Sequence, residues 1–462
     1  MNLKVILRDT GVVVKYSSIS FLFPIFAAIY YGEYFTIKYF FIAFLAALVL
    51  GDAIEKVFRT DEKTLLKEGL MCVSLIWLII PLVSAIPYIG LANISLLESL
   101  FETMSAWTTT GFSILVPETL PKAMLFFRSV QQWFGGVGIV VIAIAGVFNT
   151  SASLYYAEAR NEKIKPNILG TIKMIWWIYA AYTVLGILLL FLAGMTPFDA
   201  INHSMTAIAT GGLSTHSESI AYYNSPTVEF IIMLIMVIGS ISFLSHYDLL
   251  TGNLRKFFSD VFVRSFIILI IIGTAFVYSD RGLRTGIFTV VSAASSTGFN
   301  LDSISAWHGF SYFALIILMI VGGNAGATAS GIKINRVLVA LKSLLWSMNR
   351  IRNPRQIFSK RIGDVSYTND SLLSIYKFMM LYLLLFMLGT FVFLYDGYGL
   401  NLSMFQSASA LGNSGLSVIS TYGTFSMSTA IFLMWAGRLE IWAALTLLIY
   451  IAVKSMRIRL LG

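Results

Sequence analysis

Four short turns in the sequence have the composition of cation ligands, because polar residues are followed directly by a glycine in each. Carbonyl and hydroxyl oxygens in such turns can replace the hydration shell of a monovalent cation. Glycine permits the backbone angles that bring turn carbonyls toward a common axis. The candidate ligands are Thr109, Thr110 and Gly111; Thr210, Gly211 and Gly212; Ser296, Thr297 and Gly298; and Asn413, Ser414 and Gly415. We therefore predict a cation-binding ring.

A short helix is expected before each turn. Ser95 and Glu98 have the spacing of a capping box, and Thr196 can cap a helix that starts at Pro197. Each stretch has ~10–14 residues, or ~15–21 Å of helix, which is half of a membrane. A single Gly- and Ser-containing turn would more simply be a surface loop. Four of them after capped half-spans favour re-entrant pore helices, whose negative dipole ends point at the turns.

The composition is typical of a membrane protein. Of the 462 residues, 57% are hydrophobic and 12% are charged, and the mean hydropathy is +0.81. A membrane core of ~30 Å needs ~20 apolar residues in a helix. Non-helical turns at membrane depth are tolerated only inside protein or along a water-filled cavity, so four equivalent turns indicate a central pore. Ten apolar runs lie at residues 16–32, 35–52, 70–89, 124–149, 173–194, 226–247, 262–279, 308–345, 372–395 and 424–453.

Basic residues indicate the orientation of these spans. Lys and Arg concentrate at both ends of the chain and in alternate connections, which by the positive-inside rule lie in the cytoplasm. The net charge of +9 is explained by this topology, and it does not indicate nucleic-acid binding. The groups are Lys4, Arg8 and Lys15; Lys56, Arg59, Lys63 and Lys67; Arg160, Lys163 and Lys165; Arg255, Lys256 and Arg264; Arg350, Arg352, Arg355, Lys360 and Arg361; and Lys454, Arg457 and Arg459. We expect a multi-pass protein of the lipid bilayer with both termini in the cytoplasm.

The spacing of the turns defines the expected fold class. It is an all-α integral membrane protein, with a fourfold pseudo-symmetric repeat of helix, re-entrant pore helix and helix around a central pore. An N-terminal transmembrane hairpin, 1–65, precedes the repeats. The repeats are expected at residues 66–160, 161–256, 257–350 (with a broken second helix) and 351–462.

Two features lie inside the apolar runs. Residues 322–331 include Gly322, Gly323, Gly326 and Gly331, and each glycine costs a helix ~1 kcal/mol relative to alanine. We expect this stretch to break its helix; the alternative is a close-packed seam of Gly and Ala between helices. Lys333, near its end, could extend to the cytoplasm.

The second feature is a charge, Arg438, near the middle of a run. A charge at the bilayer centre costs at least ~2.5–3.5 kcal/mol, so it should face the protein interior, where a functional role is the default. The alternative is a structural partner for Glu440 or for helix-end carbonyls.

Other chemistries are disfavoured by the sequence. The single cysteine, Cys72, excludes a disulfide within one chain, and the four histidines lack metal-ligand spacing. An intramembrane enzyme would need paired carboxylates or a Ser-His dyad, and His203 beside Ser204 has no third member. A sodium-coupled transporter with inverted repeats is the main alternative, but here every glycine turn falls on the outer, charge-poor side.

With these motifs in order, the sequence resembles the Trk/Ktr/HKT superfamily of potassium transporters, specifically its TrkH-like bacterial and archaeal branch. The resemblance covers roughly residues 66–455. It is carried by the four glycine turns and by three further motifs. These motifs are Gln132-Trp133-Phe134-Gly135-Gly136-Val137-Gly138, residues 322–333, and Gly437-Arg438-Leu439-Glu440.

The resemblance implies potassium permeation through the four-glycine filter. It also implies a gate formed by the intramembrane stretch that contains Gly322, Gly323, Gly326, Gly331 and Lys333, with Arg438 as an electropositive barrier. The implied partners are a second copy of the chain in a membrane homodimer and a TrkA-like cytoplasmic ring of nucleotide-binding RCK subunits. Loop 346–363 is the expected docking surface. No organic cofactor is expected on this chain.

Overall fold

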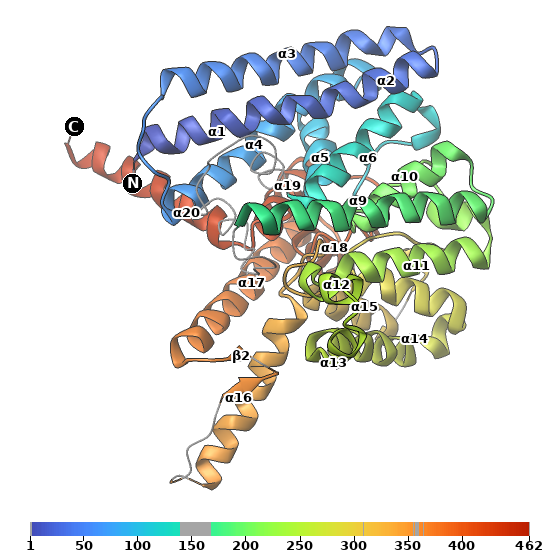
Figure 1. The fold of residues 1–462 in the computed structure, drawn as a ribbon, viewed down its shortest axis with the longest axis vertical. Helices are drawn as coiled ribbons and strands as arrows, with labels where there is room; N and C mark the ends of the chain where they lie inside the picture. The colour runs from blue at the N-terminus through green and yellow to red at the C-terminus, as the bar shows by residue number, and fades with distance from the viewer. Residues whose placement is uncertain are drawn as a thin grey trace.

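The computed structural model describes residues 2–138, 168–307, 309–353, 355, 360–363 and 365–461. Within these residues it is helical apart from a two-stranded antiparallel hairpin, β1 (Arg361–Ile362) and β2 (Val365–Ser366). The all-α membrane fold class is confirmed. Figure 1 shows helices α1 to α3 along one edge of the molecule, while α16 and β2 project from the opposite edge.

The N-terminal hairpin pairs two long helical segments. The first contains α1 (Leu3–Ser17), the 3₁₀ turn η1 (Ser18–Phe21) and α2 (Leu22–Tyr30), and the second is α3 (Tyr34–Val57). Gly11 and Gly51 lie where they cross, and a Cβ added to either would lie 2.7 Å from the carbonyl oxygen of the other. The two backbones are therefore in direct contact.

The first span is longer than the predicted run 16–32, because helix begins at Leu3. Basic residues placed before the span are therefore part of its helix. The Arg8 guanidinium donates to the carbonyl oxygens of Thr60 and Glu62, at 2.5 and 2.9 Å. Lys15 Nζ donates to Asp52 at 2.6 Å. These contacts satisfy the two charges within the helix.

Four units of outer helix, pore helix and inner helix follow the hairpin. The first is α4 (Leu66–Ala92), α5 (Leu96–Trp107), η2 (Pro117–Thr119) and α6 (Lys122–Val137). The second is α9 (Ile168–Leu192), α10 (Pro197–Ile208), η3 (Ser219–Tyr223), α11 (Pro226–Ser240), α12 (Phe243–Leu250) and α13 (Leu254–Ser259). The third is α14 (Val261–Ala294), η4 (Ile304–Ala306), α15 (Gly309–Val321) and α16 (Ile334–Arg352). The fourth is α17 (Asn369–Tyr395), α18 (Leu400–Leu411), α19 (Thr424–Arg438) and α20 (Trp442–Leu461).

Local sequence explains the starts of the pore helices. Ser95 and Glu98 form the predicted capping box at α5, and Thr196 caps α10 with Pro197 at its first position. In the third unit the outer and pore helices are joined in α14, and the chain turns at Gly282, where φ is 71°. The two pore helices whose starts the sequence predicts, α5 and α10, begin at those residues.

Among the described residues, six helices are long and apolar enough to cross a membrane, or eight if each bent pair counts as one span. Ten spans were expected. The run 308–345 is divided into α15 and α16, and the run 124–149 extends beyond the described residues at 138. The chain is a multi-pass membrane protein.

Two runs predicted as straight spans, 226–247 and 424–453, are sharply bent. The first bends by 109° between Ser240 and Phe243, and the second by 117° between Arg438 and Trp442. At the first bend, the freed carbonyl of Ser240 accepts the N–H of Asn324 from the glycine-rich loop at 2.9 Å. The first bend is therefore bonded to a distant segment of the chain, which the local apolar pattern cannot predict.

Candidate functional site

Every pore helix ends in the same backbone motif. The residue after the helix cap has a left-handed conformation, with φ of 55° at Thr109, 53° at Thr210, 56° at Ser296 and 48° at Asn413. The next N–H donates to the carbonyl five residues earlier, at 2.8–2.9 Å in all four turns. This is the bonding of a Schellman motif, formed here without glycine at the left-handed position. The backbone therefore leaves all four pore helices with the same conformation.

The four turns close into a ring. A Cβ added to Gly111 would lie closer than 3.0 Å to the carbonyl oxygen of Gly211, and the same relation runs from each turn to the next. The remaining pairs are Gly212 with Thr297, Gly298 with Ser414, and Gly415 with Thr110. Any side chain at a ring glycine would therefore overlap the neighbouring turn, and all four glycines also have positive φ.

Side chains of the ring form only part of their possible hydrogen bonds. Asn413 Nδ2 donates to Thr110 Oγ1 and to the carbonyl of Met434, both at 2.9 Å. Within the described residues, Ser296 Oγ, Asn413 Oδ1 and Ser414 Oγ are buried without a hydrogen-bond partner. Buried oxygens of this kind need a partner.

Sequence reasoning did not assign a role to one residue beside the ring. Gln132, fully buried on α6, donates from Nε2 to the carbonyl of Gly211 at 2.6 Å and accepts from the N–H of Leu213 at 3.2 Å. It thereby supports the second turn from the first unit. The only signal in the sequence was its place in the 132–138 motif.

The glycine-rich stretch forms a loop between α15 and α16, as predicted. Its backbone is bonded to the bend after α11: Asn324 N–H donates to Ser240 O at 2.9 Å, and Thr328 N–H donates to Gly239 O at 3.1 Å. The Thr328 hydroxyl also donates to the carbonyls of Gly239 and Ile208, at 2.7 and 3.0 Å. Gly322, Gly326 and Gly331 all have positive φ. The loop is therefore an ordered, protein-lined segment directly beside the ends of the pore helices.

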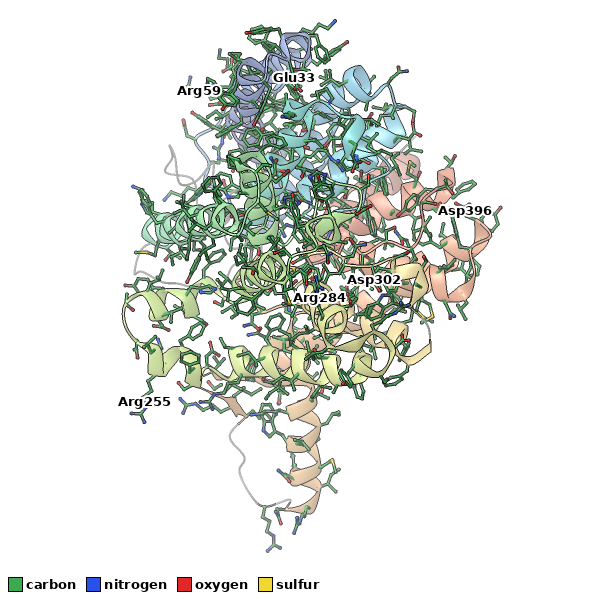
Figure 2. The ribbon with its side chains drawn as sticks, turned by 90° about the vertical axis from the view of Figure 1, so that its right-hand side faces the viewer. Glu33, Arg59, Arg255, Arg284, Asp302 and Asp396 are labelled. Carbon is green, nitrogen blue, oxygen red and sulfur yellow. The ribbon has the colours of Figure 1, made fainter. Side chains whose placement is uncertain are left out.

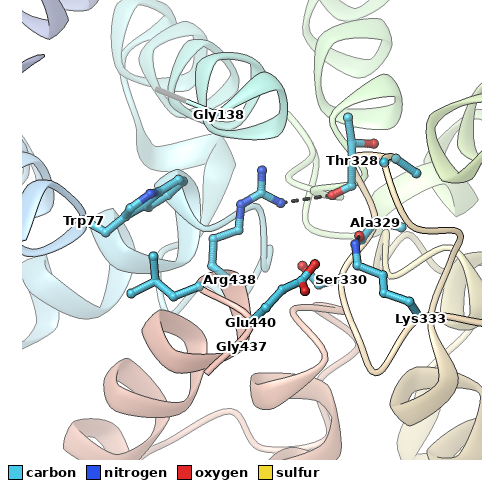
Figure 3. A pocket seen from close by; sticks show the side chains of 12 residues that line it. Trp77, Gly138, Thr328, Ala329, Ser330, Lys333, Gly437, Arg438 and Glu440 are labelled. Carbon is cyan, nitrogen blue, oxygen red and sulfur yellow. Dashed lines mark hydrogen bonds between the residues drawn. The ribbon is translucent and has the colours of Figure 1, made fainter. Parts of the chain in front are cut away.

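Arg438 joins this loop to the filter. Its Nη1 donates to the Thr328 carbonyl at 3.0 Å and to the Thr109 hydroxyl at 3.2 Å, and its Nη2 donates to the carbonyls of Gly135 and Gly136. Figure 3 shows the guanidinium pointing across the cavity to Thr328. One partly buried cation thus contacts the first turn, the loop and the end of α6.

The expectation that Lys333 extends to the cytoplasm is wrong. Lys333 is 6% exposed, and its ammonium donates to the carbonyl of Ala329 within the loop. Glu440 forms its ion pair with Arg336 of α16. Lys333, Arg438, Glu440 and Trp77 line one cavity below the ring (Figure 3).

The structure places all twelve candidate ligands in the ring, and Gly322, Gly323, Gly326, Gly331, Lys333 and Arg438 in or against the loop. Their part in ion binding and gating stays a prediction. The predicted basic group at residues 160–165 lies outside the described residues.

Re-entrant pore helices, a closed ring of carbonyl turns and broken inner helices define a multi-pass membrane transport protein. The family model of TrkH, described as a cation transport protein, matches residues 36–283 and 279–457. The chain belongs to this family. It is a transport protein and not an enzyme.

Similar proteins align over nearly the whole chain. An uncharacterized cation transporter of Methanocaldococcus jannaschii is 36% identical, covering 98% of this chain and 97% of the relative. The Trk system potassium uptake protein TrkH of Escherichia coli K12 is 33% identical, covering 97% of this chain and 98% of the relative. The crystal structure of the potassium transporter TrkH from Vibrio parahaemolyticus superimposes with a TM-score of 0.84 at 27% identity, covering 97% of this chain and 99% of that one.

Proposed function

We propose that this chain carries potassium into the cell through the ring of four glycine turns. The observation that carries the proposal is the closure of the ring, in which each glycine faces the carbonyl of the next turn. Rings of backbone carbonyls replace the hydration shell of potassium. Relatives named as potassium uptake proteins support the choice of ion.

The membrane potential is the proposed driving force. An inside-negative potential supplies about 2.3 kcal/mol per elementary charge per 100 mV. A passive pore therefore suffices to concentrate a monovalent cation, without ATP hydrolysis by this chain.

The loop 322–333 is the proposed gate. It is anchored by backbone bonds to the bend after α11 and by Arg438 to the first turn. A charged guanidinium below a cation filter opposes cation passage electrostatically. Opening then requires the loop to leave Arg438, and the glycines of the loop supply the backbone freedom for this movement.

The proposed setting is the cell membrane, with both termini in the cytoplasm and two copies of the chain in a homodimer. Lys and Arg gather in alternate connections, which supports this orientation. Figure 2 looks roughly along α3, because Glu33 and Arg59, which flank this helix, project close together in it. A cytoplasmic ring of nucleotide-binding regulatory subunits is the proposed controller of the gate. Its proposed docking surface is loop 346–363, part of which lies outside the described residues.

Ion uptake by the purified chain in liposomes tests this function. Influx of rubidium-86, a potassium substitute, is compared with influx of sodium-22 under an imposed inside-negative potential. We expect rubidium influx to exceed sodium influx and to increase with the potential. Influx that requires a sodium or proton gradient would instead support the coupled transporter.

A further inference from the structure

Each pore helix carries a buried polar residue nine positions before its filter glycine. These residues are Glu102, His203, Thr289 and Gln406, each at most 1% exposed. Two positions after each glycine lies a second polar residue, and this set is Ser113, Ser214, Asn300 and Ser417. Neither set belongs to the candidate ligands. The two sets meet behind the filter in three of the four units.

In the first unit the contact is charged. Glu102 Oε1 accepts from the Ser113 hydroxyl at 2.9 Å, from the N–H of Ile114 at 2.6 Å and from the N–H of Leu115 at 3.3 Å. Arg128, itself 2% exposed, donates to Ser113 Oγ at 2.6 Å and to Glu102 Oε2 at 3.5 Å. The segment that leaves the first turn is therefore held by one carboxylate, which Arg128 balances.

In the second unit an imidazole takes the same place. His203 Nδ1 lies 2.9 Å from the carbonyl oxygen of Asp199, so Nδ1 must carry a proton to donate. Nε2 lies 3.0 Å from Ser214 Oγ, and that oxygen already accepts the N–H of His216 at 3.0 Å. With the proton on Nδ1, a neutral imidazole leaves Nε2 free to accept from the Ser214 hydroxyl, so a neutral histidine can complete the contact.

In the fourth unit the side-chain amide of Gln406 makes the corresponding contact. Gln406 Nε2 donates to Ser417 Oγ at 3.2 Å, and Oε1 accepts from the N–H of Val418 at 3.4 Å. Gln406 also donates to the hydroxyl of Tyr422. Glutamate and glutamine thus bind the same two groups, a serine hydroxyl and the N–H that follows it.

The third unit lacks this contact. Within the described residues, the hydroxyl of Thr289 is buried without a partner, and Asn300 Nδ2 donates to Asp302 O at 3.2 Å instead. The third turn is fixed closer to its glycine, by the Ser292 hydroxyl that accepts the Gly298 N–H at 3.0 Å.

We propose that these paired positions form a clamp behind the filter, in which Glu102, His203 and Gln406 are positioning residues for ion selectivity. The inference rests on the proposed function, since it concerns the same ring. The residues that leave each glycine form no helix or strand, so their hydrogen bonds to the clamp hold the outer end of the turn. Without the clamp, the carbonyl oxygens of the ring can move closer together, and the ring then also binds smaller ions. The third turn has no such clamp and is held instead by the Ser292 hydroxyl at its glycine.

Gln406→Met provides the test, because it keeps the side-chain length and leaves no buried charge unpaired. Thr289→Val is the matched control at the equivalent position, where the hydroxyl makes no bond. Rubidium-86 and sodium-22 influx are measured in liposomes for the native chain and both variants. We expect the rubidium-to-sodium ratio to fall about fivefold in Gln406→Met, the effect of one ordinary hydrogen bond, and to stay unchanged in Thr289→Val.

Two further variants make the test independent of one substitution. Ser417→Ala removes the other side of the same clamp and should lower the ratio similarly, even where Gln406→Met does not fold. Glu102→Gln should lower the ratio as well, because it leaves the buried charge of Arg128 unpaired behind the first turn. Equal ratios in native chain, Gln406→Met and Ser417→Ala would overturn the clamp. A native chain that does not prefer rubidium over sodium would overturn the proposed function itself.

Discussion

At the scale of single residues, Arg438 is the charge that contacts both the filter and the loop. Its guanidinium bonds to a filter hydroxyl, to the loop and to helix-end carbonyls, and it lies over the ring of Trp77. Sequence reasoning placed it in the interior from the cost of a membrane charge. The same reasoning failed for Lys333, because its burial depends on how the loop folds back on itself.

Replacing Arg438 by glutamine should raise rubidium influx several-fold. The variant removes the positive charge below the filter and weakens the bond that joins Thr328 to the first turn. Influx is measured in liposomes at equal protein amounts. Arg59→Gln is the control, since it removes the charge of an exposed arginine away from the loop and the filter. An influx in Arg438→Gln that equals the native value would contradict the gating role.

At the scale of elements, the pore helices were predictable and the bends of the inner helices were not. Capping residues and the glycine position are local signals, so α5, α10 and the four turns could be placed from sequence. The bends at 240–243 and 438–442 occur inside apolar runs, and at the first of them the freed backbone is bonded to a loop from another unit. The hydrophobic pattern carries no information on such a partner.

The capping box of α5 should contribute measurably to stability. Ser95→Ala removes the side-chain acceptor for the Glu98 N–H, and loss of such a cap costs about 1 kcal/mol. We expect a lower apparent melting temperature in detergent. Ser95→Asp retains an oxygen acceptor and should restore most of the loss. If Ser95→Ala has the native melting temperature, the capping box does not stabilise α5, and packing alone does.

The attachment of the loop is a second property at this scale. Thr328→Val keeps the shape of the side chain and removes hydroxyl bonds to the carbonyls of Gly239 and Ile208. We expect increased rubidium influx, because the closed position of the loop loses stabilising contacts. Thr446→Val, whose exposed hydroxyl bonds only within α20, is the control. A decrease in influx would indicate that the loop supports the filter and does not close it.

At the scale of the whole molecule, four units contribute one turn each to a shared ring, while only one contributes the loop. The part that repeats in all four units therefore forms the candidate filter. The loop, which occurs in one unit, forms the candidate gate. This division was visible in the sequence, because the glycine turns repeat and the 322–333 stretch occurs once. The sequence does not show how close the four turns lie in space.

Regulation should depend on the basic end of α16. Replacing Arg350, Arg352 and Arg355 together by glutamine should abolish the response of rubidium influx to nucleotide and regulatory subunits, while basal influx persists. All three are exposed, so the fold should be retained. The same replacement of Arg281 and Arg284 should leave the response intact. An unchanged response in the triple variant would reject this docking surface.

The most direct test of the account is substitution of the ring glycines by serine, one at a time. Gly111→Ser, Gly212→Ser, Gly298→Ser and Gly415→Ser each place a side chain against the next carbonyl, whereas Gly194 has a similar φ of 99° with open space around it. Rubidium-86 and sodium-22 influx are compared in liposomes. The account predicts a reduced rubidium-to-sodium ratio in all four ring variants and a native ratio in Gly194→Ser. A native ratio in the ring variants, or an equal loss in Gly194→Ser, would contradict a four-glycine filter.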